Sequence, residues 1–401
     1  MDATELFSSN AIQDPYPLYE RMRAAGPVHQ FGDSSFYAAC TWAAVNEAVA
    51  RPEDFSSNMV ATMRYTPEGT VAPFELASMG AYSNVLATAD DPVHAAHRKM
   101  LVPQLAAKRI RLVEEFATEA TNRIWKENAG TGVIEWMSAM ANSLPMMVVA
   151  QLIGVPLADV EKLERWGTAG TQILEGLLSE EELTAAAMTG LELFTYINEH
   201  FATAAADPQD NLLGDLATAC ASGEIDQLTA QVMMGTLFSA GGESTSSLLG
   251  SAAYVLATND DVQTQLRANP GLLGAFIEEA LRFEPPFRAH YRSVPADTTL
   301  AGVDLPAGSN LLLLWGSANR DPAEFEDPDT FKLDRPRGKN HLTFGRGVHL
   351  CVGASLARFE AQIVLGTLLD RTRRIDARAV GNWLPSLLVR RLDRLELDLA
   401  A

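Results

Sequence analysis

Cys351 is the residue whose surroundings most clearly favour chemistry. It lies in the glycine-rich segment FGRGVHLCVG, residues 344–353, which runs directly into a predicted helix near Ala354. Unpaired N–H groups and the positive dipole end at a helix start favour a thiolate, so we expect a depressed pKa for Cys351. The three glycines let the backbone turn tightly and approach a flat partner closely. His349, two residues upstream, could then reach a carboxylate on that partner.

A lone cysteine of this kind is compatible with several sites. A buried structural role is the usual fate of a lone cysteine. A nucleophile with His349 as its base would need the two side chains to meet, which neighbours two residues apart on a tight turn rarely do. A zinc site would need further ligands at matching spacing, and the sequence has none. A single thiolate as the only protein ligand fits haem iron best.

The segment from Phe344 to Arg358, FGRGVHLCVGASLAR, resembles the haem-binding signature of the cytochrome P450 monooxygenases at every fixed position. The resemblance implies heme b as the cofactor, with Cys351 as the axial ligand of its iron and with Phe344, His349 and Gly353 beside it. It also implies the cytochrome P450 fold, mostly α with small β-sheets, as a single domain over residues 1–401.

Glu279-Ala280-Leu281-Arg282 places two opposite charges three residues apart, where they share a helix face and can pair. Such pairs are common on solvated helices. The resemblance makes this the family's E-x-x-R pair and implies that Arg335 is the third member of the network. Its implied role is to lock the segment that presents Cys351.

Several basic side chains stand where the family holds the haem propionates. His94 and Arg98 lie four residues apart on one predicted helix face, which by itself is typical of a surface helix. The resemblance implies that these two, with Arg292 and His349, bind the propionates and that His290 is a further polar partner. Donors that converge on two carboxylates are favourable in a poorly solvated pocket.

A long, nearly uncharged helix is predicted from Thr229 to Ala257, with the motif AGGEST near its middle. Two adjacent glycines in a helix interior cost about 1 kcal/mol each, so they favour a local distortion that lets a ligand approach the backbone. A close helix–helix crossing with Glu243 paired elsewhere is the alternative. The resemblance implies an oxygen-binding segment that includes Ala240 and Gly241, with Glu243 as the proton-supplying acid.

Ser244 stands where the family usually has threonine, and Thr245 follows it. In a helix, a serine hydroxyl can turn back to the carbonyl four residues earlier, here that of Ala240. We therefore expect an enzyme that loses part of its reducing equivalents as peroxide. Thr245 is the alternative relay hydroxyl.

Periodicity predicts many helices and few strands. The predicted helices are Tyr16–Ala25, Trp42–Arg51, Pro92–Gln104, Lys108–Asn128, Asp159–Leu178, Glu181–Ala204, Thr229–Ala257, Leu272–Phe283 and Ser355–Asp370. The predicted strands are Val28–Gln30, Phe36–Ala39, Thr298–Val303, Asn310–Leu314 and Leu387–Leu397. Residues 57–84 carry no predicted element, and long loops of this kind are often functional.

The 401 residues carry 51 acidic and 31 basic side chains, a formal charge of −20, which disfavours a nucleic-acid partner. The sequence shows neither a bilayer-spanning apolar run nor a secretory signal at MDATELFSSN. Three cysteines, at positions 40, 220 and 351, indicate a reducing compartment rather than a disulfide framework. We expect a cytoplasmic protein without a membrane anchor.

The resemblance extends over essentially the whole chain and is closest to bacterial, particularly mycobacterial, members. It implies a haem-thiolate monooxygenase that inserts one atom of O2 into a small hydrophobic organic substrate. Electrons would come from NAD(P)H through a separate ferredoxin reductase and ferredoxin. A peroxide-driven peroxygenase of the same fold, a non-catalytic haem-binding protein and a cysteine hydrolase without haem are the alternatives.

Two further expectations concern the surroundings of the haem. Arg288 is either an anchor for an acidic substrate or a surface or propionate-directed arginine. The substrate pocket is expected to draw on Ser57–Asn84, Ile173–Phe201, Thr236–Ala240, Phe287–His290 and Leu387–Leu388. A basic patch for an acidic ferredoxin is expected from Lys99, Lys108, Arg109, Arg111, Arg337, Lys339 and Arg346.

Overall fold

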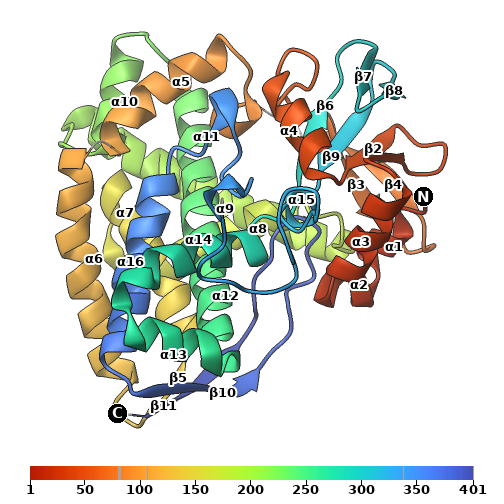
Figure 1. The fold of residues 1–401 in the computed structure, drawn as a ribbon. Helices are drawn as coiled ribbons and strands as arrows, with labels where there is room; N and C mark the ends of the chain where they lie inside the picture. Colours follow the sequence, from red (N-terminus) through yellow and green to blue (C-terminus); the bar gives the residue numbers. More distant parts are fainter. Residues whose placement is uncertain (80–82, 106, 337, 401) are drawn as a thin grey trace.

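The computed structural model describes residues 1–79, 83–105, 107–336 and 338–400, and the side chains of residues 79, 104 and 107–112 lie outside that description. Helix makes up 55% of the structure, which confirms the predicted class, mostly α with small β-sheets. Most helices form one large body, and the first four helices gather with most of the short strands beside it (Figure 1).

The element bounds are as follows. The α-helices are α1 (Thr4–Phe7), α2 (Ser9–Gln13), α3 (Tyr16–Ala25), α4 (Trp42–Ala50), α5 (Val93–Leu101), α6 (Ala107–Asn128), α7 (Ser143–Ile153), α8 (Val160–Gln172), α9 (Glu180–Ala206), α10 (Leu212–Ala221), α11 (Gln227–Phe238), α12 (Ser244–Thr258), α13 (Asp260–Ala268), α14 (Leu273–Phe283), α15 (Trp315–Ala318) and α16 (Ala354–Asp370). The strands are β1 (Val28–Gln30), β2 (Phe36–Ala39), β3 (Ala61–Tyr65), β4 (Val71–Glu75), β5 (Val133–Glu135), β6 (His290–Ser293), β7 (Thr298–Leu300), β8 (Val303–Leu305), β9 (Asn310–Leu313), β10 (Arg374–Val380) and β11 (Leu395–Ala400).

The largest sheet has the strand order β1-β2-β9-β6, in which β2 and β9 are parallel and the other neighbours antiparallel. In β6, His290 pairs with Leu313 of β9 and Arg292 pairs with Leu311. Because alternate residues of a strand share a face, His290 and Arg292 project to the same side of the sheet. A second sheet has the order β10-β11-β5, and β3-β4 and β7-β8 are hairpins.

The predicted long helix is present but is interrupted. Helices α11 and α12 are joined by a π-helical turn, η6 (Ser239–Glu243), which contains both glycines of AGGEST. A Cβ on Gly241 would lie 2.6 Å from Cγ2 of Val149, and one on Gly242 would lie 2.4 Å from Cε of Met146. The glycines therefore let η6 lie directly against α7, which is the helix-crossing alternative that the sequence left open.

Most predicted elements are found with small shifts at their ends, and two predicted strands are wrong. Thr298–Val303 is instead the hairpin β7–β8, because Ala301 and Gly302, with φ of 49° and 80°, reverse the chain. In the predicted strand Leu387–Leu397, only the end from Leu395 is strand. The carbonyl of Leu387 accepts a hydrogen bond from the Arg288 side chain rather than from a neighbouring strand.

The region from Ser57 to Asn84, which carried no predicted element, contains the hairpin β3–β4. The predicted helix Asp159–Leu178 is shorter, because α8 ends at Gln172. Gly176, at φ 73°, follows it, and its carbonyl accepts from the N–H of Tyr65 at the end of β3. Positive φ favours glycine, so the chain leaves the helical conformation before this point.

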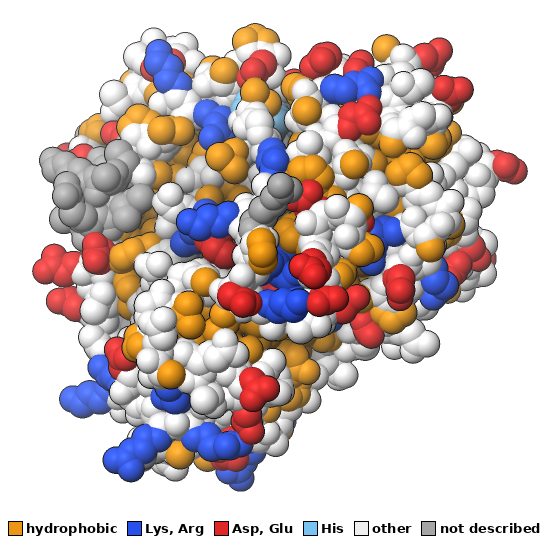
Figure 2. Space-filling model, in the orientation of Figure 1, with side chains coloured by type: hydrophobic (Ala, Val, Ile, Leu, Met, Phe, Trp, Pro, Cys, Tyr) orange, Lys and Arg blue, Asp and Glu red, His pale blue; other side chains and the backbone are white. Residues whose placement is uncertain are grey.

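Among the helices of the described segments, none is long and apolar enough to cross a bilayer. The face drawn in Figure 2 carries acidic, basic and apolar side chains interspersed with one another. On this face, therefore, the acidic side chains are not gathered in one block.

Candidate active site

The cysteine segment folds as a tight loop in front of α16. The N–H of Cys351 donates to the carbonyl of Phe344 at 2.9 Å, which closes the loop. Gly345 and Gly347 both have φ of 66°, a left-handed conformation that glycine adopts without the strain that a side chain causes. The loop thereby holds Cys351 three residues before the first residue of α16.

The loop forms one wall of a cavity that offers about 250 Å³ to the centres of water-sized molecules. Its other walls come from α5, from α11 and α12, and from β6. Much of the lining is apolar, with Leu86, Leu101, Leu237, Leu248 and Phe287 among the contributors. The sulfur of Cys351 thus faces a largely apolar space.

At one side of this cavity, donors from three elements come together. His94 and Arg98 of α5, Arg292 of β6 and His349 of the loop all line it. The His94 and His349 rings are 4.0 Å apart between centroids, and Nη1 of Arg98 donates to the carbonyl of Leu350 at 2.9 Å. The hydrogen bond from Arg98 fixes α5 against the cysteine loop.

The electrostatics of this cluster favour an anion. Burial lowers the pKa of Arg292 to about 10, although nearby Asp90 opposes the shift. Burial and the positive potential of His94 and Arg292 lower the pKa of His349 to about 4. A negative group in the cavity would relieve this mutual repulsion.

The opposite wall belongs to the interrupted helix, where Ala240 and Ser244 line the cavity. Oγ of Ser244 donates to the carbonyl of Ala240 at 2.6 Å, which confirms the predicted back-bonded hydroxyl. Glu243 instead faces away, with Oε1 3.5 Å from Nη2 of Arg391.

Comparison with known proteins decides the family. A model of the family described as cytochrome P450 matches residues 195–374. Cytochrome P450 144 of Mycobacterium tuberculosis is 64% identical over 396 residues, which cover 99% of this chain and 91% of that protein. The chain belongs to the cytochrome P450 family.

Solved structures of other cytochromes P450 have the same fold. CYP109E1 from Bacillus megaterium, in complex with testosterone, is 28% identical with a TM-score of 0.87, and the match covers 98% of this chain and all of that one (100%). CYP150A6 from Mycobacterium marinum, in the substrate-free form, is 28% identical with a TM-score of 0.82, and the match covers 100% of this chain and 98% of that one. Cytochromes P450 are monooxygenases that use O2 and bind heme b through a cysteine thiolate, so this protein is a haem-thiolate monooxygenase.

The residues of this cytochrome P450 fit the cofactor. A haem presents iron at its centre and two carboxylates at one edge, and the cavity offers a thiol on one wall and a cationic cluster on another. The prediction that the pKa of Cys351 is depressed is wrong: burial raises the pKa of this thiol, more than the N–H groups of Gly353 and Ala354 lower it. A metal cation at the sulfur would counter this shift, because a coordinating thiol is deprotonated outright.

Several predicted site residues lie behind the cavity wall of this cytochrome P450. Gly241 and Gly353 were expected to contact the cofactor. Gly241 instead faces Val149 of α7, and Gly353 directs its N–H toward the sulfur of Cys351. Thr245 is buried within α12, outside the cavity lining. The π-helical turn changes which residues face the cavity, so 3.6-residue spacing does not carry through it.

Arg288 is neither a substrate anchor nor a surface or propionate-directed residue, and both of those interpretations are wrong. Its guanidinium is buried and donates to the carbonyls of Ala11, at 3.0 Å, Leu387, at 3.2 Å, and Ser386. It joins the N-terminal helices to the segment that follows β10.

The predicted pocket segments are partly confirmed. Residues of Thr236–Ala240 and Phe287–His290 line the cavity, whereas the described residues of 57–84, 173–201 and 387–388 do not. Sequence reasoning missed Trp315 and Leu248. Leu248 lies four residues after Ser244, so helical spacing alone identifies it.

Behind the cysteine loop, the predicted charge network is present. Nε of Arg282 donates to Oε2 of Glu279 at 2.8 Å, and Nε of Arg335 donates to Oε1 at 2.9 Å. Nη1 of Arg282 also donates to the backbone carbonyl of Asn319 at 2.9 Å. The network therefore joins α14 to the segment that leads to the cysteine loop.

His290 provides a test of this geometry through pH. Nε1 of Trp315 donates to its Nδ1 at 2.7 Å, and burial lowers the pKa of His290 from 6.5 to about 3. The folded protein thus binds fewer protons here than the unfolded chain, so stability falls as the pH drops below 6.5 toward 3. Glutamine does not titrate. In this pH range, His290→Gln should therefore lose less unfolding free energy per pH unit than the parent, by up to about 1.4 kcal/mol.

Urea unfolding of the holoprotein at about pH 7 and about pH 5 measures this difference. His200 is partly exposed on α9, so His200→Gln is the matched control. This variant should keep the parental pH dependence of the unfolding free energy. Equal losses in the parent and in His290→Gln would contradict the buried neutral imidazole.

Proposed function

We propose that this cytochrome P450, as a single domain over residues 1–401, oxidises a small hydrophobic organic molecule with Cys351 as the axial ligand of its heme b. The observation that carries the proposal is the place of the thiol. All three cysteines lie in the described residues; Cys40 is buried beside the carbonyl of Gly26, Cys220 lies on α10, and Cys351 borders the cavity. When bound, the haem supplies O2 binding and activation.

The side chains around the cavity have distinct roles in this proposal. Arg98, Arg292, His94 and His349 bind the propionates, because two guanidinium groups and two imidazoles converge at one side of the cavity. Phe344 packs beside the thiolate, and Ala240 leaves room on the opposite wall. The apolar lining excludes water and favours a hydrophobic substrate.

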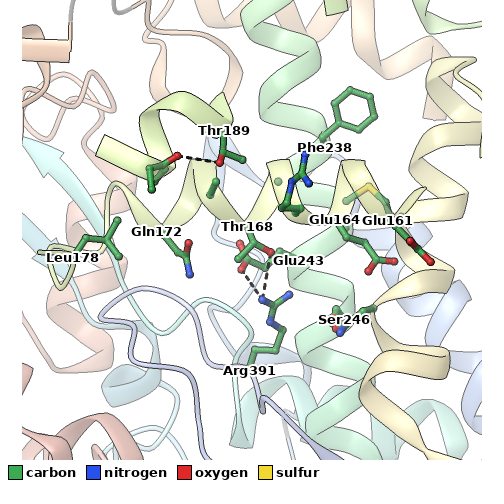
Figure 3. Close-up of a pocket in the computed structure, with 18 of the residues that line it drawn as sticks. Glu161, Glu164, Thr168, Gln172, Leu178, Thr189, Phe238, Glu243, Ser246 and Arg391 are labelled. Carbon is green, nitrogen blue, oxygen red and sulfur yellow. Dashed lines mark hydrogen bonds and ion pairs between the residues drawn. The ribbon is translucent and has the colours of Figure 1, made fainter. Parts of the chain in front are cut away.

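Protons reach the cavity through Ser244 and Glu243. Ser244 is the hydroxyl in the cavity wall, and Glu243 is the next residue, buried on the other side of the same turn. Burial raises the pKa of Glu243, so this carboxyl holds its proton at higher pH than an exposed one. In this proposal Glu243 turns from Arg391 (Figure 3) toward Ser244 to supply the proton, and Ser244 passes it to water in the cavity. Thr245, within the helix packing, supports the turn.

Electrons arrive at the cysteine face from an acidic ferredoxin, itself reduced by NAD(P)H through a reductase. Lys99 and Lys339 are exposed, and Arg346 lines the cavity beside the loop. Val348 and Leu350, next to Cys351, are 45% and 48% exposed, which suits a transient docking surface. The side chains of Lys108, Arg109 and Arg111, and the whole of Arg337, lie outside the described residues.

The axial-ligand assignment predicts that Cys351→Ser abolishes turnover and the strongly red-shifted carbon monoxide band of reduced thiolate-ligated haem. Cys220→Ser is the matched control and should keep both. The measurement is the reduced carbon monoxide difference spectrum. An unchanged band in Cys351→Ser would refute the assignment.

The relay assignment makes a prediction about coupling. Because Ser244 donates to the carbonyl of Ala240, its hydroxyl is partly withdrawn from the cavity. Ser244→Thr, with its stiffer side chain, should lower the peroxide released per NAD(P)H consumed, and Ser244→Ala should raise it. Thr245→Ala, which removes the other hydroxyl, should match the parent. Loss of coupling in Thr245→Ala alone, with no effect in either Ser244 variant, would show that Thr245 is the relay.

The docking assignment predicts that electron transfer from an acidic ferredoxin slows as salt rises, because the screening length falls to ~10 Å at about 0.1 M. Stopped-flow reduction under carbon monoxide measures this rate. Lys99→Glu should slow association several-fold, whereas Lys126→Glu, near the far end of α6, should not. A rate that is independent of salt in both variants would contradict the docking site.

A further inference from the structure

One buried carboxylate receives hydrogen bonds from both sides of the cysteine loop. Glu278 of α14 is 7% exposed and precedes Glu279 in the chain, but it has different partners. Its Oε2 lies 3.2 Å from Nε2 of His341. Its two oxygens also accept from Nε and Nη2 of Arg358, at 2.6 and 3.0 Å. Because His341 precedes Cys351 in the chain and Arg358 follows it, one side chain holds the loop from both ends.

The hydrogen bonds to Glu278 fix the direction of both partners. A planar guanidinium that donates two N–H groups to one carboxylate is held in orientation as well as in place. Burial lowers the pKa of His341, and the N–H of Thr343 donates to its Nδ1 at 3.3 Å, so the proton of the neutral ring is on Nε2 and points to Glu278. Burial opposes the charge of Glu278, but the hydrogen bonds from His341 and Arg358 lower the pKa of this carboxyl to about 2. Glu278 is therefore an anion at neutral pH.

Arg358 brings its positive charge close to the sulfur of Cys351. Its guanidinium carbon lies 4.4 Å from the ring centroid of Phe344, and its Nη1 donates to the carbonyl of Ala354 at 3.3 Å. Phe344 lines the cavity with Cys351, and its carbonyl closes the loop. Burial raises the pKa of the Cys351 thiol, and the charges of Arg98 and Arg358 lower it. The proposed function pairs Arg98 with the propionates, whereas Arg358 belongs to the helix behind the sulfur.

We propose that Glu278 is a positioning residue that holds Arg358 beside the thiolate of Cys351, and that the charge of Arg358 raises the reduction potential of the bound haem. Reduction adds one electron to the haem, so a nearby cation favours the reduced state. The inference rests on the proposed ligation of the haem by Cys351. It adds to that function a control of how readily the haem accepts an electron.

Redox titration of the substrate-free holoprotein with dithionite and mediator dyes measures this potential without a protein partner. Arg358→Gln removes the charge and should lower the potential, so that the ratio of oxidised to reduced haem at a fixed ambient potential rises about fivefold. Arg358→Lys keeps the charge and should restore most of that loss. Arg371→Gln removes the same charge at the far end of α16 and is the matched control. A parental potential in Arg358→Gln, or an equal fall in Arg371→Gln, would overturn the proposal.

Glu278→Gln separates positioning from a direct effect of the carboxylate charge. Three N–H groups converge on Glu278, and an amide offers them one acceptor oxygen, so its NH2 group faces at least one donor. The Arg358 side chain is 34% exposed and can turn toward solvent. The potential should therefore fall in Glu278→Gln, and the same change should add little to Arg358→Gln. Loss of the negative charge alone would raise the potential, so a rise or a parental value in Glu278→Gln would overturn the positioning role.

The reduced carbon monoxide spectrum keeps this test apart from the ligation itself. Potentials are compared among proteins that show a full thiolate band. A parent without that band would refute the ligation by Cys351, whereas a full band with an unchanged potential in Arg358→Gln would refute only the role of Arg358. If Glu278→Gln loses the band, the comparison of Arg358→Gln with Arg358→Lys decides: equal potentials in these two variants would overturn the proposal.

Discussion

The position of Cys351 in the cavity wall depends on the buried ion pairs that the carboxylate of Glu279 makes with Arg282 and Arg335. Glu279 is 2% exposed and Arg282 is 0% exposed, so neither charge has water to replace a lost partner. A buried charge is tolerated when it is paired and hydrogen-bonded on all sides, and removal of one partner is strongly destabilising. Arg282, Arg335 and the N–H of Lys332 all donate to this one carboxylate.

The network reaches the cysteine loop through Asn319. Arg282 holds the backbone carbonyl of Asn319, and the side chain of Asn319 accepts from the N–H of Leu342 at 2.7 Å and donates to Oγ1 of Thr343 at 2.9 Å. Thr343 directly precedes Phe344, whose carbonyl closes the loop around Cys351. A continuous chain of hydrogen bonds thus runs from a helix interior to the thiolate side of the haem cavity.

The sequence predicted the residues of motifs better than the directions in which they point. Cys351, Glu279 and His94 belong to motifs identified by the family resemblance, and the structure places Cys351 and His94 in the cavity wall and pairs Glu279 with Arg282. Gly241 and Glu243 turn away because a π-helical turn, which forms where α7 packs on the glycines, shifts the facing residues. That packing comes from residues about ninety positions earlier in the chain, so no local spacing contains it.

The predictions for the Arg288 side chain and for the pKa of Cys351 were wrong for the same physical reason. Arg288 bonds to carbonyls of Ala11 and Leu387, which are distant in sequence. The pKa of Cys351 depends on burial by the assembled cavity walls, and that desolvation exceeds the local helix-start contribution. Local dipoles and spacing can be read from a sequence, but burial is a property of the whole fold.

Asn319→Ala removes the link to the cysteine loop and leaves Glu279, Arg282 and Arg335 in place, so it tests whether this network presents Cys351. The measurement is the carbon monoxide difference spectrum of the reduced protein, normalised to the haem it retains, with Glu326→Gln, an exposed change in the same segment, as the control. If the network presents Cys351, the thiolate band should be smaller in Asn319→Ala, with helix content as in the parent, and full in the control. A full thiolate band in Asn319→Ala would contradict this role of the network.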